Sequence, residues 1–233
     1  MKRLLGLSLA AAIALTSQVS AKEVKLEVAG NAALTSNYVW RGISYTNTTP
    51  TSQVGVDFDN LFKVEGLHLN LWGSGIQEGS EIDTIIGYSF KAGPATIDLG
   101  LINYYYTQDY IPDTFAGASY GEAYVDVQFA NFGVSVWSEI GYADSNTDVY
   151  DGLTVIANAS FAGIDLYVGT RMTDYVDPIT NLAAEDSVFG QISYSWDSIL
   201  IPSFTTTVFV AGNDQFTDSQ GESTAGITFS KDF

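Results

Sequence analysis

Apolar and polar residues alternate along most of the chain. Between residues 25 and 41 the even positions are apolar or small and end in Tyr38 and Trp40, whereas the odd positions are polar or small and end in Arg41. A period of two residues is typical of a β-strand whose faces meet different surroundings. The pattern therefore predicts a strand over residues 25–41, with Arg41 on its polar face.

The same alternation recurs to the end of the chain and predicts about twelve strands, each long enough to cross a bilayer at a tilt. The further segments are 53–59, 67–74, 81–90, 95–106, 122–129, 132–142, 153–161, 164–171, 188–196, 204–212 and 224–233. Tight connections (91–94, 130–133, 160–163) lie between longer polar ones (107–121, 143–152, 173–187, 213–223). Short turns at one end and long loops at the other are typical of an all-β, up-and-down transmembrane β-barrel of antiparallel strands.

A soluble barrel or sandwich also alternates, but with its apolar face inward. Two features favour the membrane form. The polar face is rich in glycine and carries charges in mid-strand, which suits a water-bearing lumen. Aromatic residues gather near the strand ends on the apolar side, as in the aromatic girdles of membrane barrels. These aromatic residues are Tyr38, Trp40, Tyr88, Phe90, Tyr105, Phe129, Phe132, Tyr142, Phe161 and Trp196.

The chain ends on Phe233, which follows apolar residues at alternating positions. This ending resembles the signal by which the barrel-assembly machinery recognises outer-membrane barrels. Lys231 breaks the alternation because its position faces outward, where its ammonium group could extend to the lipid headgroups.

The N-terminus has the pattern of a secretory signal. Lys2 and Arg3 precede an apolar run from Leu4 to about Leu15, and small residues follow up to Ala21. The run is shorter than the roughly 20 apolar residues of a membrane-spanning helix. We therefore expect a signal peptide over residues 1–21 and a single outer-membrane barrel over residues 22–233.

The stretch "ALTSNYVWRGISYTNTTPTSQVGVDF", followed by "LWGSGI" and "EIDTIIGY", resembles the TorF family of porins from Gram-negative bacteria. The first motif matches at Ser36, Tyr38, Arg41 and Gly42, and the later segments match at Trp72, Gly73, Ser74, Asp83, Gly87 and Tyr88. Beyond about residue 90 the likeness is one of architecture. The resemblance implies an outer-membrane barrel with a pore, and it implies no particular substrate.

Charge indicates what the lumen holds. The chain has 9 Lys and Arg against 27 Asp and Glu, a net charge of −18. By strand phase, the lumen and selectivity candidates are Arg41, Asp57, Asp83, Asp98, Glu122, Asp126, Glu139, Asp165 and Arg171. For any single residue, a structural charge pair is the simpler interpretation. For the group, the acidic surplus favours cations, as rings of carboxylates do in channels. We expect Arg41 to pair with a carboxylate on a neighbouring strand.

Other kinds of site find little support. The acidic chain lacks a basic footprint for nucleic acid. It has no cysteine and one histidine, His68, and nothing indicates a cofactor. The "GASYG" segment (117–121) matches a serine-hydrolase pattern without its strand–turn–helix context. A hydrolase like the twelve-stranded outer-membrane phospholipases would need a histidine on the lipid face, whereas His68 has the lumen phase. "DSNTD" (144–148) has the spacing of half a calcium loop but lacks the required glycine and glutamate, so no metal site is predicted.

The pattern as a whole favours an outer-membrane pore for passive transport of small polar solutes, with a preference for cations from its acidic lumen. The alternative is a non-conducting barrel that acts as an adhesin, receptor or structural protein. Outer-membrane lipid and lipopolysaccharide are the expected surroundings in either case. The oligomeric state is not indicated.

Overall fold

A computed structural model describes residues 23–77, 79–107, 119–142, 152–173, 186–201, 203–214 and 223–233. The predicted signal peptide (1–21) and the segment 144–148 lie outside these ranges, as do residues 117 and 118 of the "GASYG" segment. Among the described residues, no helix is both long and apolar enough to cross a membrane.

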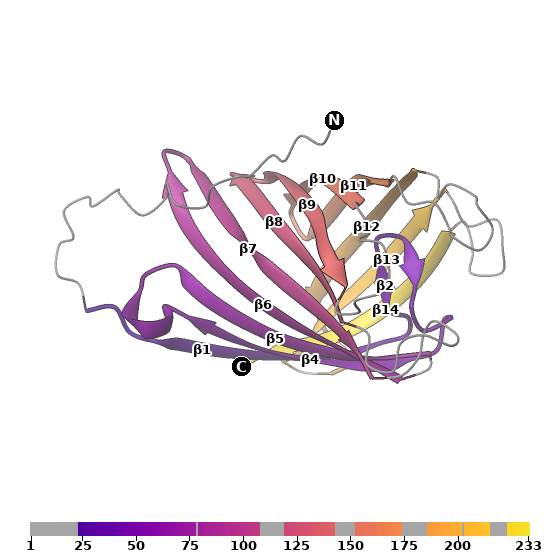
Figure 1. The fold of residues 1–233 in the computed structure, drawn as a ribbon. Coiled ribbons are helices and arrows are strands. Elements are labelled where there is room, and N and C mark those ends of the chain that lie inside the picture. The colour runs from indigo at the N-terminus through magenta and orange to yellow at the C-terminus, as the bar shows by residue number, and fades with distance from the viewer. Residues whose placement is uncertain are drawn as a thin grey trace, which may run out of the picture.

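The described strands form one closed antiparallel barrel of twelve strands (Figure 1). Its strands are β1 (Glu27–Thr35), β4 (Thr51–Asp59), β5 (Leu67–Ile76), β6 (Gly79–Ala92), β7 (Ala95–Tyr106), β8 (Ser119–Phe129), β9 (Phe132–Tyr142), β10 (Gly152–Phe161), β11 (Ile164–Thr173), β12 (Ser187–Asp197), β13 (Thr205–Asn213) and β14 (Ser223–Asp232). Each strand pairs with the next along the chain, and β14 pairs with β1. The predicted fold class and strand number are therefore confirmed.

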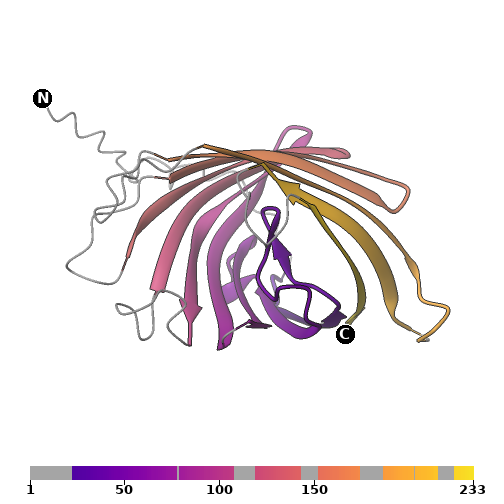
Figure 2. The same cartoon turned by 90° about the vertical axis from the view of Figure 1, so that its right-hand side faces the viewer.

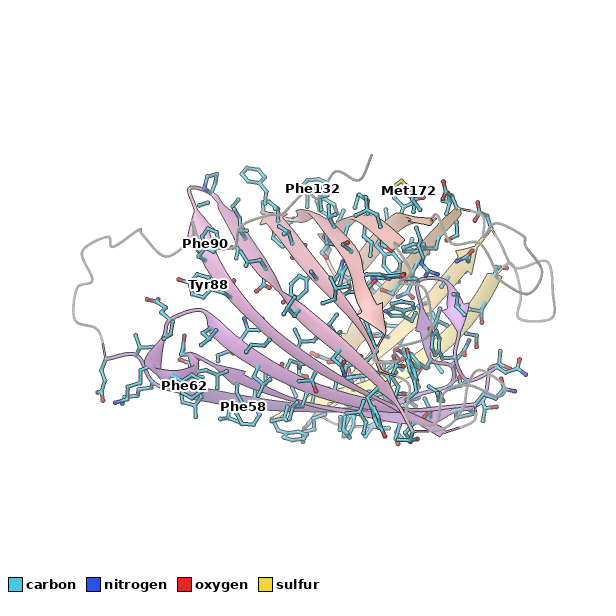
Figure 3. The ribbon with its side chains drawn as sticks, viewed as in Figure 1. Phe58, Phe62, Tyr88, Phe90, Phe132 and Met172 are labelled. Carbon is cyan, nitrogen blue, oxygen red and sulfur yellow. The ribbon has the colours of Figure 1, made fainter. Side chains whose placement is uncertain are left out.

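The apolar face of the strands points away from the barrel. The apolar side chains Val125 of β8 and Ile164 of β11 are 46% and 44% exposed. Asp83 belongs to the polar face of β6 and is only 7% exposed. Figure 3 shows Tyr88, Phe90 and Phe132 projecting from the outer surface. Because hydrocarbon tolerates only side chains such as these and a barrel satisfies its own backbone, this is the surface of a membrane-type barrel. The predicted orientation is confirmed.

The seam of the barrel is completed by the last residue of the chain. The backbone N–H of Gly30 in β1 donates to the carbonyl of Phe233 over 2.7 Å, and the N–H of Phe233 donates to the carbonyl of Gly30 over 2.9 Å. The Phe233 ring also covers Gly30, where a Cβ atom would lie 2.8 Å from the ring. A glycine at position 30 therefore makes room for the terminal aromatic ring.

The tight connections follow the sequence prediction, with one exception. Turns at 93–94, 130–131 and 162–163 join β6 to β7, β8 to β9 and β10 to β11. The exception is the connection between β5 and β6. It is short, because β5 ends at Ile76 and β6 begins at Gly79, yet it lies at the end of the barrel where the other connections are long. At the opposite end, β4 and β5 are joined through a short 3-10 helix, η2 (Leu61–Lys63).

The predicted strand over residues 25–41 is wrong in its second half. The barrel strand β1 ends at Thr35, and the chain then folds into a two-stranded hairpin of β2 (Val39–Trp40) and β3 (Ile43–Ser44). Arg41 and Gly42 form its turn, with φ angles of 48° and 79°. Positive φ at both central residues defines the tight turn that suits a two-residue hairpin. Figure 2 shows this indigo segment surrounded by the barrel strands. We call residues 36–50 the lumen hairpin.

Candidate functional site: the lumen and its hairpin

The base of the lumen hairpin is held by a buried asparagine. The Asn37 side chain is 2% exposed and donates through Nδ2 to Thr224 Oγ1 of β14 over 2.7 Å. Its Oδ1 accepts from Ser44 Oγ at 2.6 Å and from Thr46 Oγ1 at 3.0 Å. These bonds tie both arms of the hairpin to each other and to the barrel wall, so the hairpin is an ordered part of the fold.

The tip of the hairpin is held by an ion pair across the lumen. Arg41 Nη1 and Nη2 donate to Glu122 Oε1 and Oε2 over 2.8 and 2.9 Å, and the Tyr104 hydroxyl donates to Glu122 Oε2 over 2.8 Å. The Arg41 side chain is 7% exposed and that of Glu122 is 1% exposed. Two parallel hydrogen bonds fix both distance and direction, which makes this the strongest kind of carboxylate contact.

Aromatic and backbone contacts support the same arginine. The guanidinium carbon lies 4.1 Å from the ring centre of Trp40 and 5.6 Å from that of Trp137. From the far wall, Asn213 Nδ2 donates to the Arg41 carbonyl over 3.1 Å. The hairpin tip therefore contacts β7, β8, β9 and β13 and bridges walls that are distant in the barrel.

Arg41 pairs with a carboxylate as expected, but the predicted geometry is wrong. Glu122 lies on β8, whereas the neighbours of β1 are β4 and β14. Arg41 itself lies in a turn rather than at a strand end. The physical reason is the backbone reversal at Arg41 and Gly42, which carries the guanidinium into the lumen and releases it from the phase of β1.

Gly42 permits the close approach of the hairpin to the wall. Its φ of 79° disfavours a side chain, and a Cβ atom there would collide with the carbonyl oxygen of Gly212 in β13. The "RG" of the N-terminal motif therefore has two structural tasks, which are ion pairing by the arginine and backbone proximity at the glycine.

Tyr38 and Trp40 are lumen residues, which corrects their prediction as girdle aromatics. Tyr38 is 8% exposed, and its ring centre lies 5.3 Å from those of Tyr45 and Trp72. Trp40 packs edge-on against Tyr104 at 5.8 Å. Burial and the neighbouring Glu81 carboxylate raise the pKa of Tyr38 well above its usual value.

Other predicted girdle residues do lie on the outer face. Those with exposed side chains are Tyr88, Phe90, Tyr105, Phe129, Phe132 and Phe161. Trp196 stacks on the outward Tyr194 at 5.5 Å. The side chain of Tyr142 lies outside the described part of the structure.

A second ion pair lies on the inner wall. Arg171 of β11 donates through Nε and Nη2 to Glu139 Oε1 of β9 over 3.1 and 2.6 Å. The Glu139 side chain is 2% exposed and that of Arg171 is 39% exposed. The two lumen arginines thus each neutralise one glutamate.

The five candidate aspartates lie on the inner face of the barrel wall. No Arg or Lys of the described residues lies within ion-pair distance of them. Asp57 accepts from Asn70 at 2.5 Å, Asp126 from Gln128 at 3.1 Å and Asp165 from Ser160 at 2.6 Å. Asp98 lies 3.6 Å from His68 Nε2. Asp83 Oδ1 is buried and has no hydrogen-bond partner within the part of the chain that the structure describes.

Sequence reasoning left Glu81 out of the candidates, although its phase places it beside Asp83. Glu81 is 2% exposed, and its Oε1 accepts from the Tyr106 hydroxyl at 2.9 Å. The signal was present in the sequence, since Glu81 and Asp83 are two residues apart on the same strand face. Together they form a buried acidic pair beneath the hairpin aromatics.

His68 faces the lumen, as its phase predicts. Its Nδ1 lies 3.3 Å from the Gly66 carbonyl, and its Nε2 lies 3.4 Å from the Tyr124 hydroxyl and 3.6 Å from Asp98. No serine is among its contacts in the described part of the chain. This geometry differs from a nucleophile–histidine pair at the lipid face.

A cavity of about 320 Å³ lies beside the hairpin tip. Trp40 and Arg41 form one side of it, and Tyr104 and Trp137 form another. The remaining wall comes from β10, β11 and β12 near the middle of those strands, at Asn158, Tyr167 and Gln191. The hairpin therefore narrows the lumen at mid-height and leaves space alongside its tip.

Comparison with solved structures shows likeness of fold. A structure described as "Unveiling the Mechanism Behind the in-meso Crystallization of Membrane Proteins" aligns with 88% of this chain and 83% of its own, at 11% identity and a TM-score of 0.53. The KdgM porin aligns over 88% of this chain and 97% of its own, at 8% identity and a TM-score of 0.49. A BenF-like porin from Pseudomonas fluorescens Pf-5 aligns over 87% of this chain at 10% identity and a TM-score of 0.45, and this chain spans 59% of that protein.

A sequence search finds no match among curated proteins. A family model does match. It covers residues 20–138, just over half of the chain, and is described as "Bacterial protein of unknown function (Gcw_chp)". The match includes the whole lumen hairpin and its partner Glu122. The chain therefore belongs to the Gcw_chp family of bacterial proteins.

Proposed function

We propose that this protein is a pore of the Gram-negative outer membrane that lets small polar solutes diffuse through a lumen narrowed by the hairpin. The observation that carries the proposal is a polar interior with space beside an ordered constriction, inside an apolar outer face. Barrels of about eight strands are filled by side chains, and those of about 16–18 strands leave wide channels. A twelve-stranded barrel lies between these cases, so an inward hairpin can set its effective width.

A preference for cations follows from the lumen charge. The two lumen arginines are each engaged by a glutamate, while the five aspartates have no Arg or Lys partner among the described residues. Fixed carboxylates along a narrow path lower the energy of a passing cation and raise that of an anion. The resemblance to the TorF porins agrees with this proposal and rests on the motif around the hairpin.

Export and assembly complete the proposal. Residues 1–21 would direct export and be removed, and residues 22–233 would then form the barrel. Phe233 would be recognised by the barrel-assembly machinery. Outer-membrane lipid and lipopolysaccharide would surround the apolar face. We assign no covalent chemistry or cofactor to the barrel.

The second candidate is a non-conducting barrel that serves as an adhesin, receptor or structural element. One observation favours it, which is that the hairpin tip is bonded to opposite walls and Glu122 is fully buried. A hairpin fixed in this way could close the path.

Planar-bilayer recording separates the two candidates. Purified full-length protein should give reproducible conductance steps that grow with salt concentration, with a reversal potential shifted toward cation permeation under a salt gradient. Folded protein that inserts, shown by heat-modifiable electrophoretic migration, and yet stays silent would contradict the pore and favour the closed barrel.

A further inference from the structure

The cavity beside the hairpin tip carries no net charge of its own. Among the described residues that line it, none carries a carboxylate, and the single cation among them, Arg41, is neutralised by the bidentate contact with Glu122. Binding an ion here would require a counter-charge that the lining does not offer. The cavity therefore suits an uncharged solute.

Three polar side chains form a row across its wall. Asn158 of β10 is the direct cross-strand partner of Tyr167 in β11, and Tyr167 is the direct partner of Gln191 in β12. Direct partners on one face of antiparallel strands have Cβ atoms about 5 Å apart. Two amides and a phenol hydroxyl are thus presented at one level of the lumen.

The polar atoms of these side chains are the part that is available to a ligand, since the Tyr167 ring itself packs edge-on against Phe189. Within the part of the chain that the structure describes, the side chains of Asn158, Tyr167 and Gln191 make no hydrogen bond to another residue. The Trp137 indole Nε1 differs from them, because it is buried without an acceptor among the described residues and does not face the cavity. A ligand that displaces water from the cavity must give these amide and hydroxyl groups new hydrogen bonds, because an unsatisfied polar group costs free energy. The lining therefore offers both donors and acceptors.

Aromatic rings form the apolar part of the cavity wall, opposite in character to the polar side chains. Trp40 and Tyr104 meet edge-on at 5.8 Å, and both line the cavity together with Trp137. Rings offer large, rigid apolar surface at little cost in conformational entropy. A ligand that fits must combine many hydroxyl groups around its edge with carbon–hydrogen faces that pack on aromatic rings.

We propose that this cavity is a binding subsite for an uncharged sugar ring. Its volume lies at the lower end of the roughly 300–1,000 Å³ range of small-molecule sites, which also combine apolar walls with a few polar groups. The inference rests on the proposed pore, because it names the class of solute that would pass the constriction.

Binding can be measured without conduction. The full chain in detergent micelles is titrated with glucose and maltose while tryptophan fluorescence is recorded, since Trp40 and Trp137 both line the cavity. We expect a saturable change in the millimolar range. Glucuronate and glucosamine, the anionic and cationic relatives of glucose, should bind at least about tenfold more weakly, because a buried unpaired charge costs free energy.

Matched variants locate the site. Gln191→Leu and Asn158→Leu should each weaken sugar binding several-fold, whereas Gln53→Leu, the same change on the inner face of β4 away from the cavity, should leave it unchanged. Trp137→Phe keeps an aromatic ring but removes part of the apolar surface that the indole presents to the cavity, so it should also weaken binding and gives a second kind of variant if the leucine variants do not fold. Heat-modifiable migration checks the fold of each protein.

Several results would overturn the site. These are the absence of saturable binding by either neutral sugar, equal weakening by Gln53→Leu and Gln191→Leu, and stronger binding of glucosamine than of glucose. Failure of the site and failure of the pore are distinguishable. Sugar binding by a barrel that is silent in bilayers would contradict only the pore, and conductance without sugar binding would contradict only the subsite.

Discussion

Arg41 and Glu122 are 81 positions apart in the sequence and meet in the lumen through two hydrogen bonds of 2.8 and 2.9 Å. One residue forms the turn of an inward hairpin, and the other projects from the inner face of β8. This contact joins the first connection of the barrel to its opposite wall and fixes the width of the lumen at that level.

Loss of Arg41 should destabilise the barrel and widen the lumen at the level of the hairpin. Arg41→Ala leaves Glu122 buried without its partner, and breaking one half of a buried pair costs about 3–5 kcal/mol. We expect the free energy of urea unfolding, measured in micelles, to fall by this amount, and the conductance steps to become larger. Lys25→Ala, which removes an exposed cation beside β1, is the control and should change neither quantity. If the unfolding free energies of the two variants agree, the pair does not hold the hairpin.

Gly42→Ala should displace the hairpin through the backbone alone. The new Cβ would collide with the Gly212 carbonyl oxygen, and overpacking of this kind costs about 1–3 kcal/mol. Gly93→Ala is a matched control, because Gly93 also has positive φ (63°) but has no atom within 4 Å of its Cβ position. Conductance should rise for Gly42→Ala only. Equal effects of the two substitutions would assign the cost to φ rather than to the contact.

Neutralising the unpaired lumen aspartates should reduce cation preference. Asp126→Asn and Asp57→Asn remove charges that none of the described Arg or Lys residues balances, so the reversal potential in a salt gradient should move toward zero. Glu27→Gln, at the exposed start of β1, is the control. The difference in reversal potential between the aspartate variants and the parent protein should shrink at high salt, since the Debye length falls from about 10 Å at 0.1 M to about 3 Å at 1 M. An unchanged reversal potential would remove these carboxylates from selectivity.

A charge on the outer face should be costly at mid-strand. Val168 lies near the middle of β11 and is 55% exposed on the outer surface. An arginine at the bilayer midplane costs about 2–4 kcal/mol in such barrels. Val168→Arg should therefore lower the fraction that folds into lipid vesicles, while Val64→Arg, in the turn between β4 and β5, should not. If Val168→Arg folds as well as the parent protein, this face does not contact hydrocarbon.

The terminal residue should have separable roles. Deleting Phe233 removes two backbone hydrogen bonds at the seam, so unassisted folding into vesicles should fall. Phe233→Ala keeps those bonds and loses only the ring, so it should fold in vesicles but assemble poorly in cells, where the assembly machinery would recognise the aromatic group. Normal cellular assembly of Phe233→Ala would argue against that recognition.

Most of the fold could be predicted from the sequence because the alternation of apolar and polar residues within each barrel strand reflects the two media that the strand contacts. Val54, Leu69, Val125 and Ile164 alternate with polar neighbours, since one strand face meets an apolar medium and the other meets the lumen. The same local signal placed Asp83, Glu122 and Glu139 on the inner face. It also marked the tight turns, where polar and glycine residues interrupt the alternation.

The lumen hairpin could not be predicted in this way. Ser36, Tyr38 and Trp40 continue the phase of β1, so periodicity alone extends the strand through them. The turn at Arg41 and Gly42 had a local signal, the glycine, but its direction depends on contacts with Glu122, Thr224 and Asn213, which lie far along the chain.

The sequence by itself determined the barrel, its strand number and the face that the side chains of the barrel strands occupy, because alternation is a local response to two different media. The tertiary structure decided what fills the lumen. Closure of β14 on β1 brings β8 and β13 within reach of the hairpin tip, and the ion pair and the cavity exist only after that closure.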